Sequence, residues 1–370
     1  MSDHSILAPS SAARRVQCSG SVLFEKRYPE VLGDDDRDSA NGVAAHHVVA
    51  NMLHGELIEE GDKAENGVIV TQEMLECADV MVDDVRRVAP GADLIIERPL
   101  AVPRTHPQCW GTPDLRFWYQ GVLYVYDYKF GHRYHDVFEH LQLIEYVSGA
   151  LSEAGVDGSN DQHVEVEMVI CQPRNYHPSG PVRRWRTNAS KLRAQFNILS
   201  NAAHEALGPN PQLRVGPECR DCKARLACPA LQKAGWAAMG KSESVIPVDM
   251  PIEAVALEAR HLTEALGLLK ARLSGLETQI LASVRRGIAA PGWRVEHQKG
   301  RTVWNVPPAH VICMGQLQGV NVAKPPEPVT PKQAIDAGLD PAIVASLSHT
   351  PAGAAQLCLD NNTFTRRAFG

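Results

Sequence analysis

The order of its predicted elements gives this sequence an α/β fold, in which helices flank a mixed sheet. Helix, strand, hairpin, helix, strand and helix follow one another, and a central hairpin alternates on a period of two. The chain has 370 residues, which suggests about two domains. We expect the first domain over residues 1–235 and a mainly helical C-terminal region over residues 236–370.

The hairpin is predicted from LRFWYQGVLYVY, in which Gln120-Gly121 separates two apolar runs. Gly111-Thr112-Pro113-Asp114 leads into its first strand, and Asp127-Tyr128-Lys129 ends its second. Because side chains alternate along a strand, Asp127 and Lys129 share one face, which Asp114 can reach. Burying such charges costs several kcal/mol unless they are paired or bind a metal. The pattern therefore predicts a cation site with an adjacent lysine.

The other elements of the first domain follow from periodicity and turn residues. A helix carries His46, and Gly42 one turn earlier would let another backbone approach. A strand carries Glu97, and a later helix has Gln142 and Tyr146 on one face. In chain order we expect a capped short helix from Pro9 to near Cys18, a loop over 28–38, helices over 39–54 and 72–88, a strand over 93–100, a helix over 137–151, a strand over 163–171 and a helix over 190–207.

The C-terminal region carries a weaker signal. Leucines at three- and four-residue spacing predict a long helix that forms a helical hairpin or coiled pair. We expect a linker over 236–252, this helix over 252–286, a hairpin over 292–306 turning at Lys299-Gly300, an irregular connector over 307–331, and short helices, one capped at Asp340-Pro341.

Two carboxylates beside a lysine suit hydrolysis of a phosphodiester. Oxygen ligands are those that Mg²⁺ and Mn²⁺ prefer. A lysine near such an ion can orient or deprotonate a bound water, while the cation stabilises negative charge on a phosphate oxygen. The simpler alternative is a surface hairpin whose Asp127 and Lys129 pair in solvent. We favour the catalytic interpretation, because several features would otherwise coincide by accident: the Gly-Thr-Pro-Asp start, the apolar strand, and the helix with Gln142 and Tyr146.

These motifs resemble the PD-(D/E)XK nuclease superfamily in its RecB-like branch, whose fold is a restriction-endonuclease-like mixed sheet flanked by helices. Asp114 matches the first acidic position, Asp127 and Lys129 the D-x-K, Gln142 and Tyr146 the helical Q-x-x-x-Y, and His46 the preceding G-x-x-x-H helix. The resemblance implies that His46, Asp114, Asp127 and the Tyr128 carbonyl bind Mg²⁺ or Mn²⁺, that Lys129 assists the water, and that Gln142 and Tyr146 position DNA. Glu97 could add a carboxylate or pair with Arg98.

A second motif joins Cys219-x₂-Cys222-x₅-Cys228 to Cys18, far upstream. The spacing alone fits zinc almost as well as an iron–sulfur cluster. One cysteine before the core and three after it resemble the iron–sulfur exonucleases of CRISPR adaptation and of AddB. The R-x-x-C-x-G-S around Cys18 resembles phage-associated relatives. The resemblance implies a [4Fe–4S] cluster, with Zn²⁺ as the alternative, that staples the core together. The cysteines without such spacing are expected to be buried: Cys77, Cys109, Cys171, Cys313 and Cys358.

The leading hypothesis is a metal-dependent DNA exonuclease acting on ends or single strands in phage or bacterial recombination and end processing. Alternatives are a non-catalytic DNA-binding or assembly module on the same fold and a zinc-stapled endonuclease. With a net charge of −6, DNA binding must rest on local basic patches. A recombination or annealing protein or a helicase could be a partner. The sequence contains neither an apolar run of about 18 residues nor a signal-peptide core, so we expect a cytoplasmic protein, in the bacterial host if phage-encoded.

Overall fold

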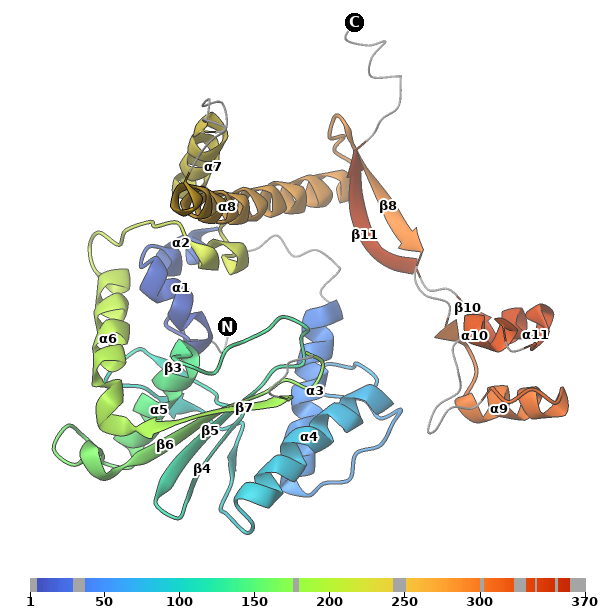
Figure 1. Ribbon diagram of the computed structural model, residues 1–370, viewed down its shortest axis with the longest axis horizontal. Helices are drawn as coiled ribbons and strands as arrows, with labels where there is room; N and C mark the ends of the chain where they lie inside the picture. The colour runs from blue at the N-terminus through green and yellow to red at the C-terminus, as the bar shows by residue number, and fades with distance from the viewer. Residues whose placement is uncertain are drawn as a thin grey trace, which may run out of the picture. The chain divides into compact units, whose positions relative to one another are not determined.

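The computed structural model describes residues 5–28, 37–175, 180–241, 251–299, 303–322, 331–336, 338–349 and 352–359. It divides into two compact units, Met1–Thr278 and Gln279–Gly370, so the boundary expected after residue 235 lies inside the first unit. The predicted α/β class is confirmed: the first unit holds a five-stranded mixed sheet flanked by helices (Figure 1).

The sheet runs in the order β1-β4-β5-β6-β7. Its strands are β1 (Ile95–Ile96), β4 (Leu115–Tyr119), β5 (Val122–Tyr128), β6 (Glu165–Cys171) and β7 (Val182–Asn188). β5 and β6 are parallel, while the other neighbours are antiparallel. Every residue of β5 is buried, as expected for a central strand covered on both faces. A separate antiparallel pair is formed by β2 (Leu100–Ala101) and β3 (Trp110–Gly111).

The predicted hairpin is confirmed as β4 and β5. Gln120 and Gly121 connect them with φ angles of 50° and 79°. Two consecutive residues with positive φ are typical of the tight turns whose twist matches that of antiparallel strands. The register pairs Leu115 with Tyr126, which places Asp114 beside the end of β5 that carries Asp127.

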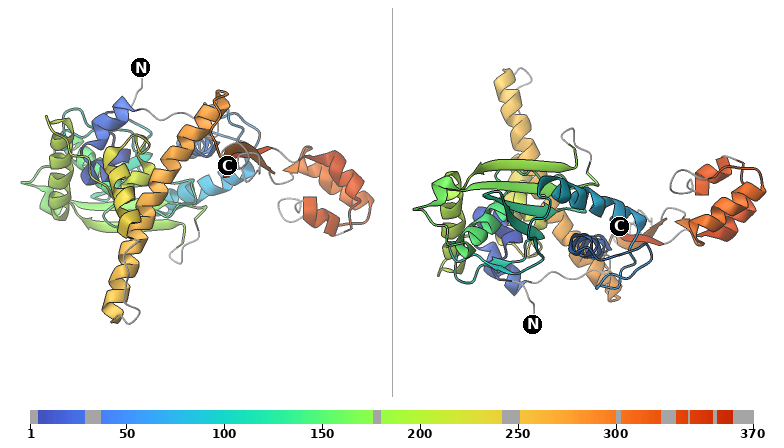
Figure 2. Two further views of the ribbon diagram at one scale, coloured as in Figure 1. Left: turned by 90° about the horizontal axis from the view of Figure 1, so that it is seen from above. Right: turned by 90° about the horizontal axis from the view of Figure 1, so that it is seen from below.

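Helices cover both faces of the sheet (Figures 1 and 2). The side chains of Tyr124, Tyr126 and Tyr128 join the core under α3 (Arg37–His54) and α4 (Gln72–Val88). Leu123 and Val125 join the opposite core, to which α1, α5 and α6 contribute. The other helical elements that begin in the first unit are η1 (Pro9–Ser11), α1 (Ala12–Gln17), α2 (Ser21–Arg27), α5 (Leu141–Glu153), η2 (Asp161–His163), η3 (Ala189–Leu192), α6 (Arg193–Leu207), η4 (Pro217–Asp221), α7 (Pro229–Lys241) and α8 (Ile252–Arg285).

Several predictions for the first unit need correction. The expected strand over 93–100 is broken at Glu97, whose φ is 44°. β7 was not predicted. The Ser11 side chain does not cap its helix but donates to the Ala8 carbonyl at 2.8 Å. Most of the loop expected over 28–38 lies outside the described residues, and the start of the expected 236–252 linker is helical as part of α7.

The second unit contains more strands than predicted. β8 (Trp293–Lys299) pairs with β11 (Ala352–Leu359), and β9 (Val303–Trp304) pairs with β10 (Ser348–His349), so the expected 292–306 hairpin is wrong. Its helices are α9 (Pro308–Leu317), where an irregular connector was expected, α10 (Pro331–Asp336) and α11 (Pro341–Leu347). The predicted cap is confirmed, because the Asp340 carboxylate accepts from Ala342 N at 2.8 Å. No helix among the described residues is long and apolar enough to cross a membrane.

Candidate metal centre and cysteine pocket

Three ligand-type side chains converge beside the central hairpin. His46 on α3, Glu97 after β1 and Asp114 before β4 bring one ligand atom each to within 4.8 Å of one another. The His46 Nδ1 lies 3.2 Å from Asp114 Oδ1 and 3.7 Å from Glu97 Oε1. His46 and Asp114 are thus together as predicted, and Glu97 joins them rather than standing apart as a partner of Arg98.

Backbone hydrogen bonds hold this group in place. Glu97 N donates to the Asp114 carbonyl at 3.1 Å, and the left-handed conformation of Glu97 ends β1 there. Such a conformation is costly for a residue other than glycine and is often retained at functional sites. Asp114 Oδ2 accepts from Tyr128 N at 2.6 Å, which connects the group to the end of β5. Gly42 does not serve the expected close approach, since no described atom lies within 4 Å of where its Cβ would be.

Asp127 and Lys129 form the neighbouring half of the site. Lys129 Nζ lies 3.0 Å from Asp127 Oδ2 and donates to Gln142 Oε1 at 3.3 Å. The predicted sharing of one face by Asp127 and Lys129 is therefore observed, and α5 supplies Gln142 to the same place. Asp127 is only 2% exposed, and it stands outside the compact group of three ligand atoms.

The electrostatics reflect a concentration of carboxylates. Burial opposes the charged form of His46, but Asp114 and Glu97 outweigh it and raise the His46 pKa to about 10. Burial also opposes ionisation of Asp114, yet His46 and then Lys129 hold the Asp114 pKa below its usual range. Burial raises the pKa of Glu97. The nearby carboxylates therefore favour a positive charge at this position. Without a bound cation, a proton on His46 supplies that charge.

The side chains of Tyr128 and Tyr146 are buried and are not exposed to a ligand at the metal centre. The Tyr128 side chain is buried in the core under α3, so only its backbone belongs to the site. Tyr146 is 5% exposed, and its hydroxyl donates to the Thr112 carbonyl at 3.1 Å. A Cβ at Gly111 would lie 2.7 Å from Pro9 Cδ and 3.2 Å from Tyr146 Cε1. Tyr146 therefore positions the Gly-Thr-Pro-Asp segment instead of presenting a surface for DNA.

The residues present fit a hard divalent cation. Carboxylate oxygens and one imidazole nitrogen are available, and no thiol is among them. Asp127 Oδ2 is buried and has the Lys129 ammonium 3.0 Å away, so a cation bound there would share this oxygen with Lys129. His46, Glu97, Asp114 and Asp127 could therefore hold Mg²⁺ or Mn²⁺.

All four predicted cysteine ligands line one pocket. Cys18, at the end of α1, meets the three cysteines around and after η4. Arg214 N donates to Cys18 Sγ at 3.3 Å, and Gly216 N donates to Cys219 Sγ at 3.4 Å. Hydrogen bonds from backbone amides to sulfur are among the interactions that stabilise metal-bound thiolates. The donor set therefore fits a thiolate-bound metal or cluster.

Close backbone approaches bring the two halves of the cysteine pocket together. Gly20 N donates to the Gln212 carbonyl at 2.9 Å, and Glu218 N donates to Gln17 Oε1 at 2.9 Å. A Cβ at Gly216 would lie 2.4 Å from Gln17 Oε1, so a larger residue there would force the Gln17 side chain to move. The helix that ends at Cys18 is thus already docked on the downstream segment through polar contacts.

A buried ion pair that no sequence pattern predicted joins the helix of the cysteine pocket to α5. Arg15 on α1 pairs with Glu145 on α5, and both side chains are fully buried. Arg15 lies three residues before Cys18, and Glu145 directly precedes Tyr146. Two charged residues at helical positions cannot be recognised as partners without the fold. The pair ties the pocket helix to the helix that carries Gln142 and Tyr146.

The remaining cysteines and one histidine can also be assigned. Cys77, Cys109 and Cys171 are buried as predicted, whereas Cys313 is exposed on α9, so that prediction was wrong. The side chain of Cys358 lies outside the described residues. His140 has a buried Nδ1 without a hydrogen-bond partner among the described residues. Burial lowers the His140 pKa, and the charges of Asp127 and Lys129 reach it.

Comparison with known proteins gave a family but no function. No curated protein matches the chain. One similar solved structure is titled "Crystal structure of SSO0001"; it shares 14% sequence identity, the match covers 59% of this chain and 85% of that chain, and the TM-score is 0.28. A family model described as "Protein of unknown function (DUF2800)" matches residues 4–311. The chain therefore belongs to the DUF2800 family.

Proposed function

We propose that this protein is a Mg²⁺- or Mn²⁺-dependent deoxyribonuclease of the PD-(D/E)XK type, which hydrolyses phosphodiester bonds at DNA ends or in single strands. The observation that carries the proposal is that two close pairs, His46 with Asp114 and Lys129 with Asp127, lie beside the end of β5. Their atoms are linked by separations of 3.2 Å from His46 to Asp114 and 3.0 Å from Lys129 to Asp127. The Tyr128 amide joins the two halves through its 2.6 Å bond to Asp114.

Each residue has a distinct part in this proposal. A bound Mg²⁺ or Mn²⁺ would polarise the scissile phosphate and increase the acidity of a bound water. His46, Glu97 and Asp114 hold the ion, and Asp127 supplies a further oxygen from the end of β5. Lys129 donates to Gln142 at 3.3 Å and can offer another N–H to a phosphate oxygen or the attacking water.

The cysteine pocket could hold an iron–sulfur cluster or zinc, because thiolate-only sites accept either. The resemblance to the iron–sulfur exonucleases favours the cluster, and we propose a [4Fe–4S] cluster bound by Cys18, Cys219, Cys222 and Cys228. It would staple α1 to the segment after α6, and thereby fix Arg15 against Glu145.

The resemblance to RecB-like nucleases motivates the biological part of the proposal. The protein would act in phage or bacterial recombination and end processing, in the cytoplasm, together with a recombination or annealing protein or a helicase. The local cationic side chains near the site, among them Lys129 and Arg133, would offset the overall negative charge where DNA binds.

A time course on end-labelled linear DNA and on closed circular DNA tests the proposal. With Mn²⁺, the wild-type protein should shorten linear single or double strands from their ends and leave circles intact. The matched inactive variant is Asp127→Asn, and chelation of the divalent metal should have the same effect. Binding without cleavage under all metal conditions would favour a non-catalytic DNA-binding module, and cleavage of circles would favour an endonuclease.

A further inference from the structure

Residues 130–140, which we call the bridging loop, connect Lys129 at the end of β5 to α5, which carries Gln142. The loop follows Lys129 and precedes α5, and the 3.3 Å hydrogen bond from Lys129 to Gln142 closes its two ends. Because both ends of the loop lie at residues of the site, a ligand bound at Lys129 and Gln142 would meet this loop.

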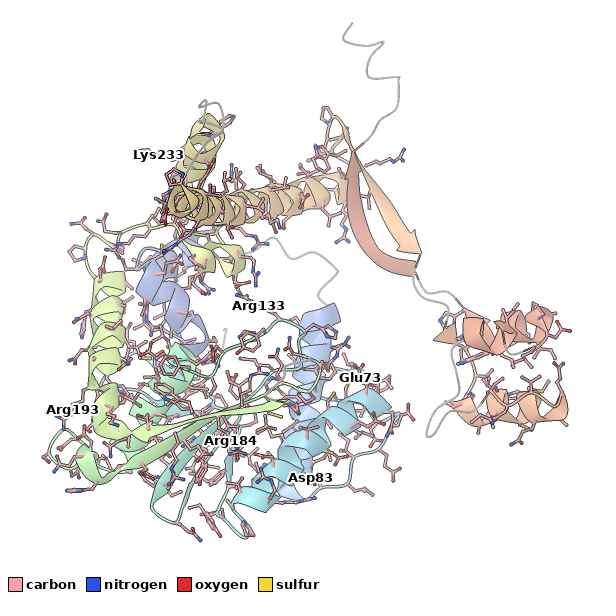
Figure 3. All side chains as sticks on the ribbon, in the orientation of Figure 1. Glu73, Asp83, Arg133, Arg184, Arg193 and Lys233 are labelled. Carbon is pink, nitrogen blue, oxygen red and sulfur yellow. The ribbon has the colours of Figure 1, made fainter. Side chains whose placement is uncertain are left out.

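Buried polar side chains hold the bridging loop in one conformation. Gln172, which is fully buried, donates to the Gly131 carbonyl at 2.9 Å and accepts from His135 N at 3.3 Å. Arg183 is 5% exposed and donates to the His135 carbonyl at 3.0 Å. Arg133, labelled in Figure 3, pairs with Asp221 beside the cysteine pocket. The loop is thus organised before any ligand binds, which reduces the entropy cost of binding.

Although these hydrogen bonds and ion pairs fix the bridging loop, two of its aromatic side chains are exposed to solvent. Phe138 is 59% exposed and Tyr134 is 43% exposed. Each ring packs against a side chain of β7: the Arg183 guanidinium lies 4.9 Å from the Tyr134 ring centroid, and the Trp185 ring lies 5.0 Å from Phe138. Arg183 and Trp185 are two residues apart, so they lie on the same face of the strand. Neither ring is needed to fill a core, and both remain accessible.

We propose that Tyr134 and Phe138 form a stacking platform for the bases of a single-stranded DNA segment that enters the metal centre. The inference rests on the proposed nuclease function and narrows its substrate to single strands or frayed ends. Exposed aromatic rings next to a cation are the usual means of binding unpaired bases without sequence preference. A paired duplex offers its base faces only at its ends, so internal duplex would not use the platform.

Gln142 and Tyr146, which the sequence suggested for DNA contact, are respectively half-buried and buried.

Binding assays on single-residue variants test the platform independently of cleavage. Fluorescence anisotropy would compare an oligothymidine with a blunt duplex of equal length, in the Asp127→Asn background without added divalent metal. Phe138→Leu and Tyr134→Leu keep an apolar side chain but remove the ring, and each should weaken single-strand binding roughly tenfold while changing duplex binding less than about twofold. Phe138→Trp and Tyr134→Phe keep a ring and should preserve the affinity.

Trp118→Ala is the matched control, because Trp118 is 38% exposed on β4 and lies outside the bridging loop. It should leave both affinities unchanged. Unaltered single-strand affinity in both leucine variants would overturn the platform, as would equal losses for single strands and duplex. If the wild type cleaves no DNA but the leucine variants still lose single-strand binding, the nuclease proposal fails while the platform stands.

Discussion

The Nδ1 atom of His46 lies 3.2 Å from Asp114 Oδ1, so a helix on one face of the sheet meets the strand hairpin at a single ion pair. Glu97 completes the group from a residue whose left-handed backbone interrupts β1. In the absence of a metal, the proton on His46 offsets part of this negative charge. A metal ion and the proton on His46 should therefore compete for the same position beside Asp114 and Glu97.

The first prediction concerns pH. Because the pKa of His46 is raised to about 10, its imidazole is protonated near neutrality and must lose that proton to bind a cation. Apparent Mn²⁺ affinity, measured by calorimetry between mildly acidic and mildly alkaline pH, should rise by up to about tenfold per pH unit. His46→Asn should bind more weakly with a flatter pH dependence. Equal pH slopes for wild type and His46→Asn would contradict a ligand role for this histidine.

The second prediction concerns the carboxylate at the end of β5. Asp127→Asn should lower the rate of Mn²⁺-dependent cleavage by roughly 100- to 1,000-fold, because it removes a buried charge from the metal centre. Thermal unfolding should report a folded protein, and its visible absorption should match that of the wild type. Asp83→Asn is the control, since Asp83 is exposed on α4 (labelled in Figure 3) and is not among the residues of the metal centre, and it should retain full activity. Near-normal cleavage by Asp127→Asn would refute the assignment.

The third prediction concerns the cysteine pocket. Cys228→Ser should bleach the visible absorption of anaerobically purified protein and lower the unfolding temperature, because ligand binding contributes folding free energy. Cys313→Ser changes an exposed thiol on α9 and should alter neither property. A colourless wild type that contains zinc would identify the alternative metal. An unchanged spectrum and metal content in Cys228→Ser would show that the ligand set is wrong.

The fourth prediction concerns the ion pair between the two sites. Arg15→Met leaves Glu145 buried without its partner, so the free energy of unfolding should fall by about 3–5 kcal/mol. The double variant Arg15→Met/Glu145→Met should recover much of this loss, because no unpaired charge remains. Arg260→Met breaks an exposed pair with Glu264 and should cost less than about 1 kcal/mol. Denaturant unfolding of the four proteins, wild type included, measures these differences; equal losses for Arg15→Met and Arg260→Met would contradict the argument.

Local patterns predicted the hairpin and most helices well. The Gln120-Gly121 pair between two apolar runs is sufficient to predict the turn of the hairpin. The helix predicted over 72–88 is observed as α4. β7 escaped prediction because its sequence, VRRWRTN, is rich in arginine. Arg184 reaches Asp84 and Glu167, and Arg186 reaches Glu165, so the strand is stabilised by acidic partners that only the fold brings near. The pairing of β8 with β11 is similarly non-local.

The sequence pattern predicted which residues belong to the site, but it did not predict how these residues are arranged in space. Spacing on β5 placed Asp127 and Lys129 on one face, and the structure adds that Lys129 also reaches Gln142. The break at Glu97 depends on backbone contact with Asp114, which no sequence pattern reveals. Likewise, the burial of Tyr146 follows from the close approach of Gly111 and Pro9. Because Tyr146 on α5 is buried whereas Tyr134 and Phe138 are exposed, we propose that DNA contacts the bridging loop rather than α5.

The most direct test of the cation site is anomalous diffraction from a crystal of the protein soaked with Mn²⁺. We predict one strong peak bound by His46 Nδ1 and by carboxylate oxygens of Glu97 and Asp114, with Asp127 supplying a further oxygen, at metal–ligand distances near 2 Å. A peak elsewhere, or none at a Mn²⁺ concentration that supports DNA cleavage, would contradict it.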